Sequence, residues 1–209
     1  MDSRFSDIVT TEAQLREVLG HPSQRVIDKQ LASLDDHSRA FLAISSFVLL
    51  ASCDDHGNMD VSPKGDPPGF VHVLDDKTIA IPDRLGNRRA DTIRNVLLNP
   101  NVGMIFLVPG KEETLRVNGT ALIVRDRWLR DRLAMNGKVP DHALVITVKE
   151  VFFHCAKCVI RSKLWDSAQW PDLSGQASLA QAMVDQARLT QSVAEMQAII
   201  DRDVRERLY

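Results

Sequence analysis

The chain has 209 residues, which is the length of one large domain or of a domain with an appendage. Hydrophobic residues make up 44% of it, enough for a sizeable core in an ordinary globular protein. The formal net charge of −2 excludes a general electrostatic attraction to nucleic acid or to an anionic membrane, although a local basic patch would still bind a small anion.

Segments that direct a chain into or across a membrane are not recognisable. No run of about 18 or more apolar residues predicts a transmembrane helix, and residues 1–14 lack the apolar stretch of a signal peptide. The three cysteines, Cys53, Cys155 and Cys158, are an odd number, which favours free thiols over a disulfide framework. We therefore expect a cytoplasmic protein.

The first part of the chain, residues 1–46, has a helical pattern. Apolar residues recur there at helical spacing, and residues typical of helix ends stand between the segments. A helix is predicted from Glu12 to Gly20, a second from Pro22 to Leu34, and a third, capped by Asp35 or Asp36, over residues 40–44.

From Phe47 onward, short apolar or alternating segments separated by turn residues predict β-strands. Their ranges are 47–51, 59–62, 71–74, 78–81, 102–108, 114–124 and 143–153, the last broken in pattern at Lys149 and Glu150. Helices are predicted between them at residues 90–98 and 126–135. Strands at short spacing, joined mostly by hairpin turns, indicate a mainly β fold: an antiparallel barrel with peripheral helices.

These patterns divide the chain into a helical segment over residues 1–46, a barrel domain over 47–170 and a C-terminal part over 171–209. Residues 170–175 have the composition of a linker. Apolar residues at three- and four-residue spacing over 176–208 predict one long helix, packed on the barrel or on a partner subunit. A free coiled coil is the alternative, which Gln186 in the apolar seam disfavours.

The first candidate binding segment is Ser-Pro-Lys-Gly-Asp-Pro-Pro-Gly-Phe, residues 62–70. Ser62 and Lys64 are two residues apart on a predicted strand, so their side chains face the same side. Gly65 and the prolines that follow make a rigid exit, and a rigid loop suits a preorganised site. The alternative is a proline-rich corner with a solvated Lys64.

The second candidate segment is residues 83–91, which hold three arginines around Gly86. Asn87 is a suitable N-cap for the helix that follows, and a helix start offers free N–H groups and a partial positive charge. Arg84 and Arg88 would add guanidinium groups that bind phosphate oxygens through bidentate hydrogen bonds. We favour a phosphate site over the alternative, a solvated basic turn paired with Asp83 and Asp91.

Motifs of other site classes are absent. The chain has no Walker A loop, no glycine-rich dinucleotide fingerprint, no nucleophile elbow and no zinc-protease helix. Chemistry carried by a cofactor fits these absences. Cys155 and Cys158 have zinc-type spacing, but only His154 and Cys53 could complete four ligands, so we expect buried structural cysteines and no metal.

Arg161 and Trp165 follow the cysteines at a spacing of four residues. A cation and a large aromatic ring so arranged shape the edge of a planar ligand pocket. The alternative is a tryptophan that closes the barrel beside a surface arginine.

Several stretches together resemble the flavin split-barrel superfamily of pyridoxamine 5'-phosphate oxidase, in particular its branch of PPOX-class FMN-dependent enzymes. They are FVLLASCDDHGNMDVSPKGDPPGFVHV, IPDRLGNRRADTIRNVLLNPNVGMIFLVPG, ETLRVNGTALIV and FFHCAKCVIRSKLWD, within residues 47–166. The resemblance implies a six-stranded antiparallel split barrel that forms a homodimer with two FMN sites at the interface. The arginine-rich strand and the C-terminal arginine motif of the oxidase itself are missing, which argues against pyridoxamine phosphate as the substrate.

The resemblance also implies which residues hold FMN. It places Ser62, Lys64, Arg84, Asn87 and Arg88 at the phosphate and ribityl chain, and Lys157, Arg161 and Trp165 near the ring of the other subunit. No catalytic residue is assigned. The function expected is an FMN-dependent oxidoreductase that acts by hydride transfer at flavin N5 on a small substrate.

Two alternatives to the enzyme stay open. One is a non-enzymatic flavin or haem carrier on the same scaffold. The other is a dimeric structural protein whose basic loop binds any phosphate.

Overall fold

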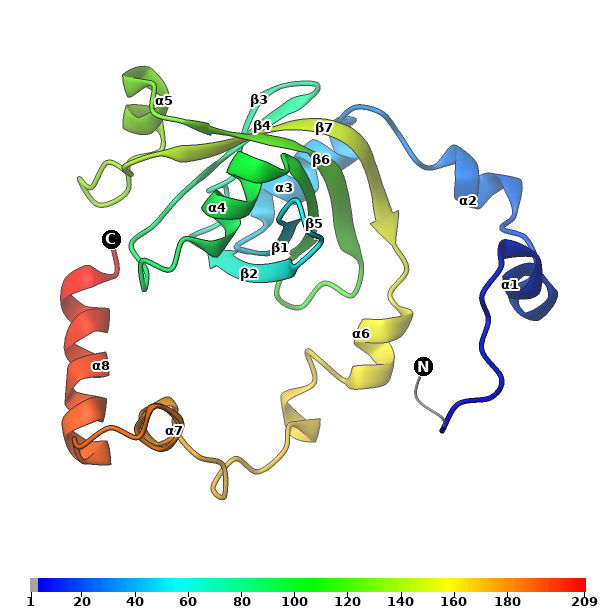
Figure 1. Cartoon of the computed structure of the whole chain (residues 1–209). Helices are drawn as coiled ribbons and strands as arrows, with labels where there is room; N and C mark the ends of the chain where they lie inside the picture. Colours follow the sequence, from blue (N-terminus) through cyan, green and yellow to red (C-terminus); the bar gives the residue numbers. More distant parts are fainter. Residues whose placement is uncertain (1–3) are drawn as a thin grey trace.

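The computed structural model describes residues 4–209, and its centre is an antiparallel sheet of seven strands (Figure 1). Each strand pairs antiparallel with its neighbours, in the order β2-β1-β5-β6-β7-β4-β3. The strands are β1 (Phe47–Cys53), β2 (Met59–Gly65), β3 (His72–Asp75), β4 (Thr78–Pro82), β5 (Asn101–Leu107), β6 (Thr114–Val124) and β7 (Ala143–His154).

The expected six-stranded split barrel is corrected to an open sheet of seven strands. Among the described residues, β2 pairs only with β1 and β3 only with β4, so both are edge strands. β3 and β4 pair as a hairpin because the chain turns back sharply after β3. In that turn the Lys77 amide donates to the carboxylate of Asp75 at 2.7 Å, which adds a short hairpin beside β7.

The sheet is strongly curved, and this curvature creates the site described below. β2 and β4 are separated by four strands in the sheet order. Even so, the Lys64 ammonium on β2 lies 3.6 Å from the carboxylate of Asp83, which directly follows β4. The curvature therefore brings residues near the two edges of the sheet close together, although the edge strands β2 and β3 do not pair with each other.

One hydrophobic cluster fills the concave side, because alternate residues of each strand point inward. Val48 and Leu50 of β1 and Ile79 and Ile81 of β4 belong to it and are completely buried. The predicted break in the last strand is confirmed. The pairing shifts from Asn118–Glu150 to Gly119–Val148, which leaves Lys149 as the extra residue of a bulge.

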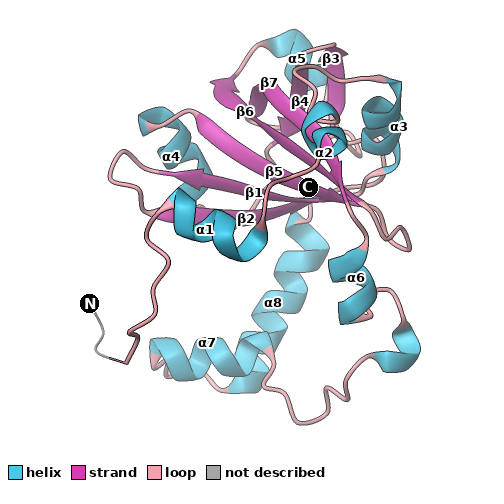
Figure 2. Ribbon diagram, turned by 90° about the vertical axis from the view of Figure 1, so that its right-hand side faces the viewer, coloured by secondary structure: helices cyan, strands magenta, loops and turns pink. Residues whose placement is uncertain are grey.

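Helices lie around the sheet (Figure 2). α4 (Asp91–Leu98) packs on β1, β2 and β6, and α3 (Asp36–Ile44), capped by Asp35, packs on β7. α1 (Glu12–Leu19) ends at Gly20 as predicted, whereas α2 (Gln24–Asp28) is shorter than predicted. It ends early because Leu31 pairs with the backbone of Val151 on the sheet. α5 (Arg127–Arg132) follows β6.

The C-terminal part differs from the single long helix that was expected. After α6 (Lys157–Ser162) and a 3₁₀ turn (Ser167–Gln169), it forms two helices, α7 (Leu179–Ala187) and α8 (Val193–Arg207). The break has two causes. Arg188 has a left-handed backbone (φ 52°), and Ser192 starts α8 through a capping box with Glu195.

We call residues 179–209 the arm. α7 and α8 pack on each other, away from the sheet, and the chain end returns to the loops beside β2 (Figures 1 and 2). Within residues 4–209, no helix is both long and apolar enough to span a bilayer.

Candidate functional site

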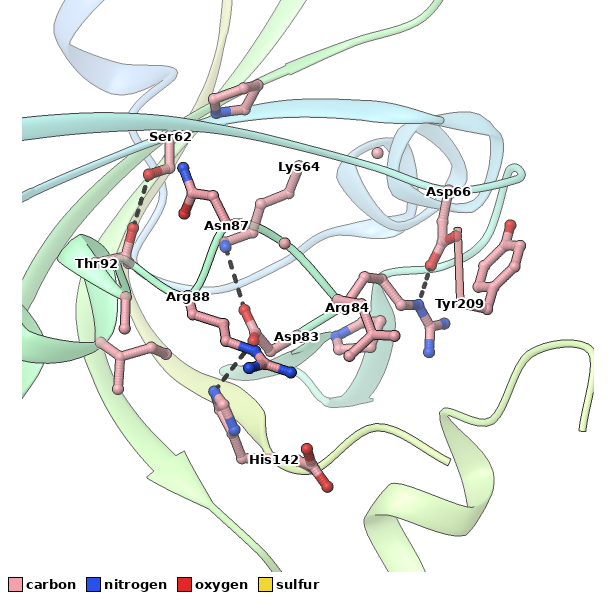
Figure 3. Close-up of a pocket in the computed structure, with 18 of the residues that line it drawn as sticks. Ser62, Lys64, Asp66, Asp83, Arg84, Asn87, Arg88, Thr92, His142 and Tyr209 are labelled. Carbon is pink, nitrogen blue, oxygen red and sulfur yellow. Dashed lines mark hydrogen bonds and ion pairs between the residues drawn. The ribbon is translucent and has the colours of Figure 1, made fainter. Parts of the chain in front are cut away.

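A cavity of about 990 Å³ opens where the two ends of the curved sheet approach each other (Figure 3). Its walls come from β2, from the loops after β2 and β4, from the first turn of α4, from Asp141 and His142, and from residues 207–209 of the arm. Ligand pockets typically measure about 300–1,000 Å³. The cavity is therefore large enough for a mononucleotide.

Five of the predicted site residues line this one cavity: Ser62, Lys64, Arg84, Asn87 and Arg88. Ser62 and Lys64 share a face because β2 is extended between them, as predicted. Arg84, Asn87 and Arg88 belong to the loop between β4 and α4. The curvature of the sheet brings this loop opposite β2.

Hydrogen bonds connect β2 to the start of α4 on one side of the cavity. The Ser62 hydroxyl donates to the carboxylate of Asp60 at 2.8 Å. The buried hydroxyl of Thr92, in the first turn of α4, lies 3.1 Å from the same carboxylate and 3.0 Å from the Ser62 oxygen. These hydrogen bonds therefore fix the distance between β2 and the start of α4 at this point.

Asn87 is not the N-cap of the following helix, which corrects the prediction. Its side-chain oxygen accepts from the Arg89 amide at 3.0 Å, two residues along the chain. The N-cap is Ala90, in a left-handed conformation (φ 56°), and no side chain caps the first turn. The N–H groups of that turn carry the partial positive end of the helix, and residues 91–93 line the cavity.

The cations of the cavity differ in how they are paired. Arg84 Nε donates to Asp66 Oδ2 at 2.6 Å, and Arg89 Nε donates to Asp91 Oδ2 at 2.8 Å. Lys64 faces Asp83 at 3.6 Å. Arg88 forms no ion pair within residues 4–209, so its guanidinium is the one most available to an anion.

His142 adds an unsatisfied polar group to the wall. Its Nε2 lies 3.3 Å from Asp83 Oδ2, close enough for an ion pair, but the geometry is not that of a hydrogen bond. The atom is buried and has no hydrogen-bond partner among the described residues. A ligand hydroxyl or a water molecule in the cavity would satisfy it.

Tyr209 is a site residue that the sequence pattern did not reveal. Its ring centroid lies 5.6 Å from Cζ of Arg84. Partial desolvation, together with a hydrogen bond to the carboxylate of Asp66, raises the pKa of the Tyr209 phenol. The helical spacing of the arm gave no signal for this contact, because a residue beyond the last helical turn reaches the cavity only through the path of the whole arm.

Lys157, Arg161 and Trp165 do not line the cavity of their own chain. The first two are on α6, and the Trp165 indole donates to the carbonyl of Lys111 at 2.8 Å. Their assignment to the site of another subunit stays a prediction.

The cysteine prediction is corrected in part. Cys155 and Cys158 are exposed and not buried, because the chain leaves the sheet at His154 before it begins α6. Cys53 is half-buried and accepts from the Asn99 side chain at 3.0 Å. In the part of the chain that the structure describes, no group of three His, Cys, Asp or Glu side chains is placed to hold a metal ion.

The solved structures that are similar to this chain are distant from it in sequence. HupZ of group A Streptococcus is 18% identical, with 57% of this chain and 93% of that chain covered and a TM-score of 0.47. A Clostridium acetobutylicum protein related to general stress protein 26 is 17% identical (56% and 85% covered, TM-score 0.42). An FMN-binding protein of Syntrophomonas wolfei is 14% identical (69% and 96% covered, TM-score 0.43).

A search of curated proteins found no match. The comparison with protein families, in contrast, gave one. The family model described as Pyridoxamine 5'-phosphate oxidase matches residues 34–155. This span contains all seven strands of the sheet, α4 and both loops of the cavity. The chain therefore belongs to the pyridoxamine 5'-phosphate oxidase family.

Proposed function

We propose that this protein is an FMN-dependent oxidoreductase that acts by hydride transfer at flavin N5 on a small substrate. FMN, when bound, supplies the ring that accepts and returns the hydride, while the protein supplies position and charge. Family membership supports the proposal. The observation that carries it is one cavity lined by Lys64, Arg84 and Arg88.

The residues of the cavity fit the polar part of FMN. Arg88 and the terminal nitrogens of Arg84 would hold the phosphate, since Arg88 forms no ion pair within residues 4–209 and Arg84 donates to Asp66 through Nε alone. Ser62, Asn87 and the unsatisfied nitrogen of His142 would face the ribityl hydroxyls. Lys64 would stay near Asp83 and supply a second positive charge to the phosphate.

We further propose that the active form is a homodimer with an FMN site at each interface. Lys157, Arg161 and Trp165 of one protomer would then complete the ring end of the partner's site. Two observations support this. These residues lie outside the cavity of their own chain, and apolar residues beside them stay exposed, among them Ile160 at 47% and Leu164 at 41%. Sedimentation analysis of the holoprotein tests the dimer; a monomer at micromolar concentration contradicts it.

The test of the cofactor assignment is a double substitution, Lys64→Ala with Arg88→Ala. We expect the purified variant to be colourless, whereas the wild-type protein carries flavin. The control removes one lysine and one arginine that are exposed and far from the cavity lining, Lys149→Ala with Arg202→Ala, and should stay yellow. A yellow Lys64/Arg88 variant would exclude these two residues as the phosphate ligands.

The absorbance spectrum of the wild-type protein separates the candidate functions. Flavin bands support the proposal, and a Soret band supports a haem carrier instead. If flavin is present, its bleaching by NADH or NADPH under anaerobic conditions distinguishes an oxidoreductase that uses these donors from a passive flavin carrier.

A further inference from the structure

The arm reaches the cavity through its last three residues only. Arg207, Leu208 and Tyr209 line the cavity, whereas the rest of α7 and α8 does not. Tyr209 makes the specific contact: Cζ of Arg84 lies over its ring, 5.6 Å from the ring centroid. Figure 3 shows Tyr209 beside Asp66 and Arg84, at the end of the cavity opposite Thr92.

The group that Tyr209 covers is an ion pair largely removed from solvent. The side chain of Asp66 is 3% exposed and that of Arg84 is 17% exposed. Arg84 uses Nε for Asp66, and its two terminal nitrogens have no hydrogen-bond partner among residues 4–209. A guanidinium held by Nε and by an aromatic ring on one face keeps both terminal nitrogens as donors for an oxyanion.

We propose that Tyr209 is a positioning residue for the phosphate of the ligand: it holds Arg84 against Asp66, so that the terminal nitrogens of Arg84 are already oriented when the phosphate arrives. The inference rests on the proposed function, since it concerns the same cavity. An arginine side chain loses considerable rotamer freedom when it is immobilised, and prior immobilisation removes that cost from binding. Tyr209 would therefore strengthen binding of the phosphate and not of the flavin ring.

FMN and riboflavin differ only in the phosphate, so this pair of ligands separates positioning from general support of the cavity. The experiment measures the Kd of each ligand by quenching of flavin fluorescence, for the full-length protein freed of flavin. For Tyr209→Ala we expect FMN affinity to fall about tenfold, a typical scale for a lost cation–π contact with its associated ordering, and riboflavin affinity to change less than about twofold.

Two further variants sharpen the experiment. Tyr209→Phe keeps the ring over Arg84 and loses only the hydroxyl, so it should restore FMN affinity to within about threefold of wild type. Val204→Ala, an exposed position of α8 outside the cavity lining, should bind both flavins as the wild type does.

A ligand-free readout accompanies these titrations. The ¹⁵Nε–¹Hε signal of Arg84 should exchange with solvent slowly in the wild type, because Nε is bonded to Asp66, and faster in Tyr209→Ala. Equal loss of FMN and riboflavin would show that Tyr209 only supports the cavity, and unchanged FMN affinity would show that it does not act on the site; either result overturns the inference. A wild-type protein that binds neither flavin refutes the proposed function itself, and the role of Tyr209 with it.

Discussion

Arg84 donates from Nε to Oδ2 of Asp66 across 2.6 Å, and this bond joins the loop after β2 to the loop after β4. Because the carboxylate of Asp66 is 3% exposed, its charge depends on Arg84 for compensation. Loss of one partner leaves the other as an uncompensated charge in a poorly solvated place. The pair therefore stabilises the cavity wall, and its arginine still has two terminal nitrogens available to a ligand.

Asp66→Ala should lower the free energy of unfolding by about 2–3 kcal/mol, somewhat less than for a fully buried pair because Arg84 keeps some contact with solvent. The double variant Asp66→Ala with Arg84→Ala should lose at least about 1 kcal/mol less than the sum of the two single losses. Urea unfolding of the four proteins completes the cycle. Strictly additive losses would mean that the two side chains do not depend on each other.

Arg88→Gly should separate stability from ligand binding. Arg88 has a left-handed backbone (φ 62°), which costs a residue with a side chain about 1–2 kcal/mol. Glycine removes this strain, and its greater freedom in the unfolded chain offsets about 0.5–1 kcal/mol of the gain. We expect unchanged or slightly higher stability together with clearly weaker FMN binding. Wild-type FMN affinity in this variant would remove Arg88 from the site.

Two glycines of the sheet should respond very differently to alanine. A Cβ at Gly119 would lie 2.2 Å from the backbone carbonyl oxygen of Thr147, which cannot move without disrupting β7. A Cβ at Gly103 would lie 3.3 Å from a side-chain oxygen of Asn118, which can shift. Gly119→Ala should cost about 3 kcal/mol or more, and Gly103→Ala about 1 kcal/mol or less, in thermal or urea unfolding. Equal costs would argue against the bulge beside Gly119.

Stability should fall on the acid side of neutrality because two histidines are held neutral. Burial, followed by the charge of Arg132, lowers the pKa of His72, and burial, followed by the charge of Arg116, lowers the pKa of His154. The unfolded chain therefore binds more protons than the folded one below about pH 6.5, the ordinary pKa of histidine. The contribution of the two neutral histidines to the free energy of unfolding is therefore complete above that pH. It is lost as the pH falls towards their lowered pKa values in the folded protein.

The measurement is the free energy of unfolding at about pH 7.5 and about pH 5.5 for the wild type and for His72→Gln with His154→Gln. The wild type should lose more stability between these two pH values than the double variant does. An equal loss in both proteins would assign the pH dependence to other groups.

Local patterns in the sequence were sufficient to predict most elements of the sheet. The alternation over residues 114–124 predicts a strand with the bounds of β6, because alternate residues of a strand point to opposite faces. The same reasoning predicts each of the other strands to within a few residues. The family resemblance implied six strands, whereas the local patterns predicted seven strand segments, which is the number in the sheet.

The cavity residues on β2 and on the loop between β4 and α4 could likewise be predicted from the sequence. Ser62 and Lys64 are paired by strand periodicity, and the arginines around Gly86 precede a helix. Asn87 as the N-cap was a wrong prediction, since propensity identifies a suitable residue but the backbone of Ala90 decides where the helix begins. The break between α7 and α8 was missed because the apolar spacing continues across it.

The sequence by itself therefore determined the strands, the helix around residues 91–98 and the chemical character of two basic loops, all of which depend on residues close together along the chain. Only the tertiary structure decided that the sheet curves enough for Lys64 to meet Asp83, that Arg84 is paired with Asp66, and that Tyr209 covers that pair. These contacts join segments that are distant along the chain. Their partners are selected by the packing of the whole core, which no local period in the sequence encodes.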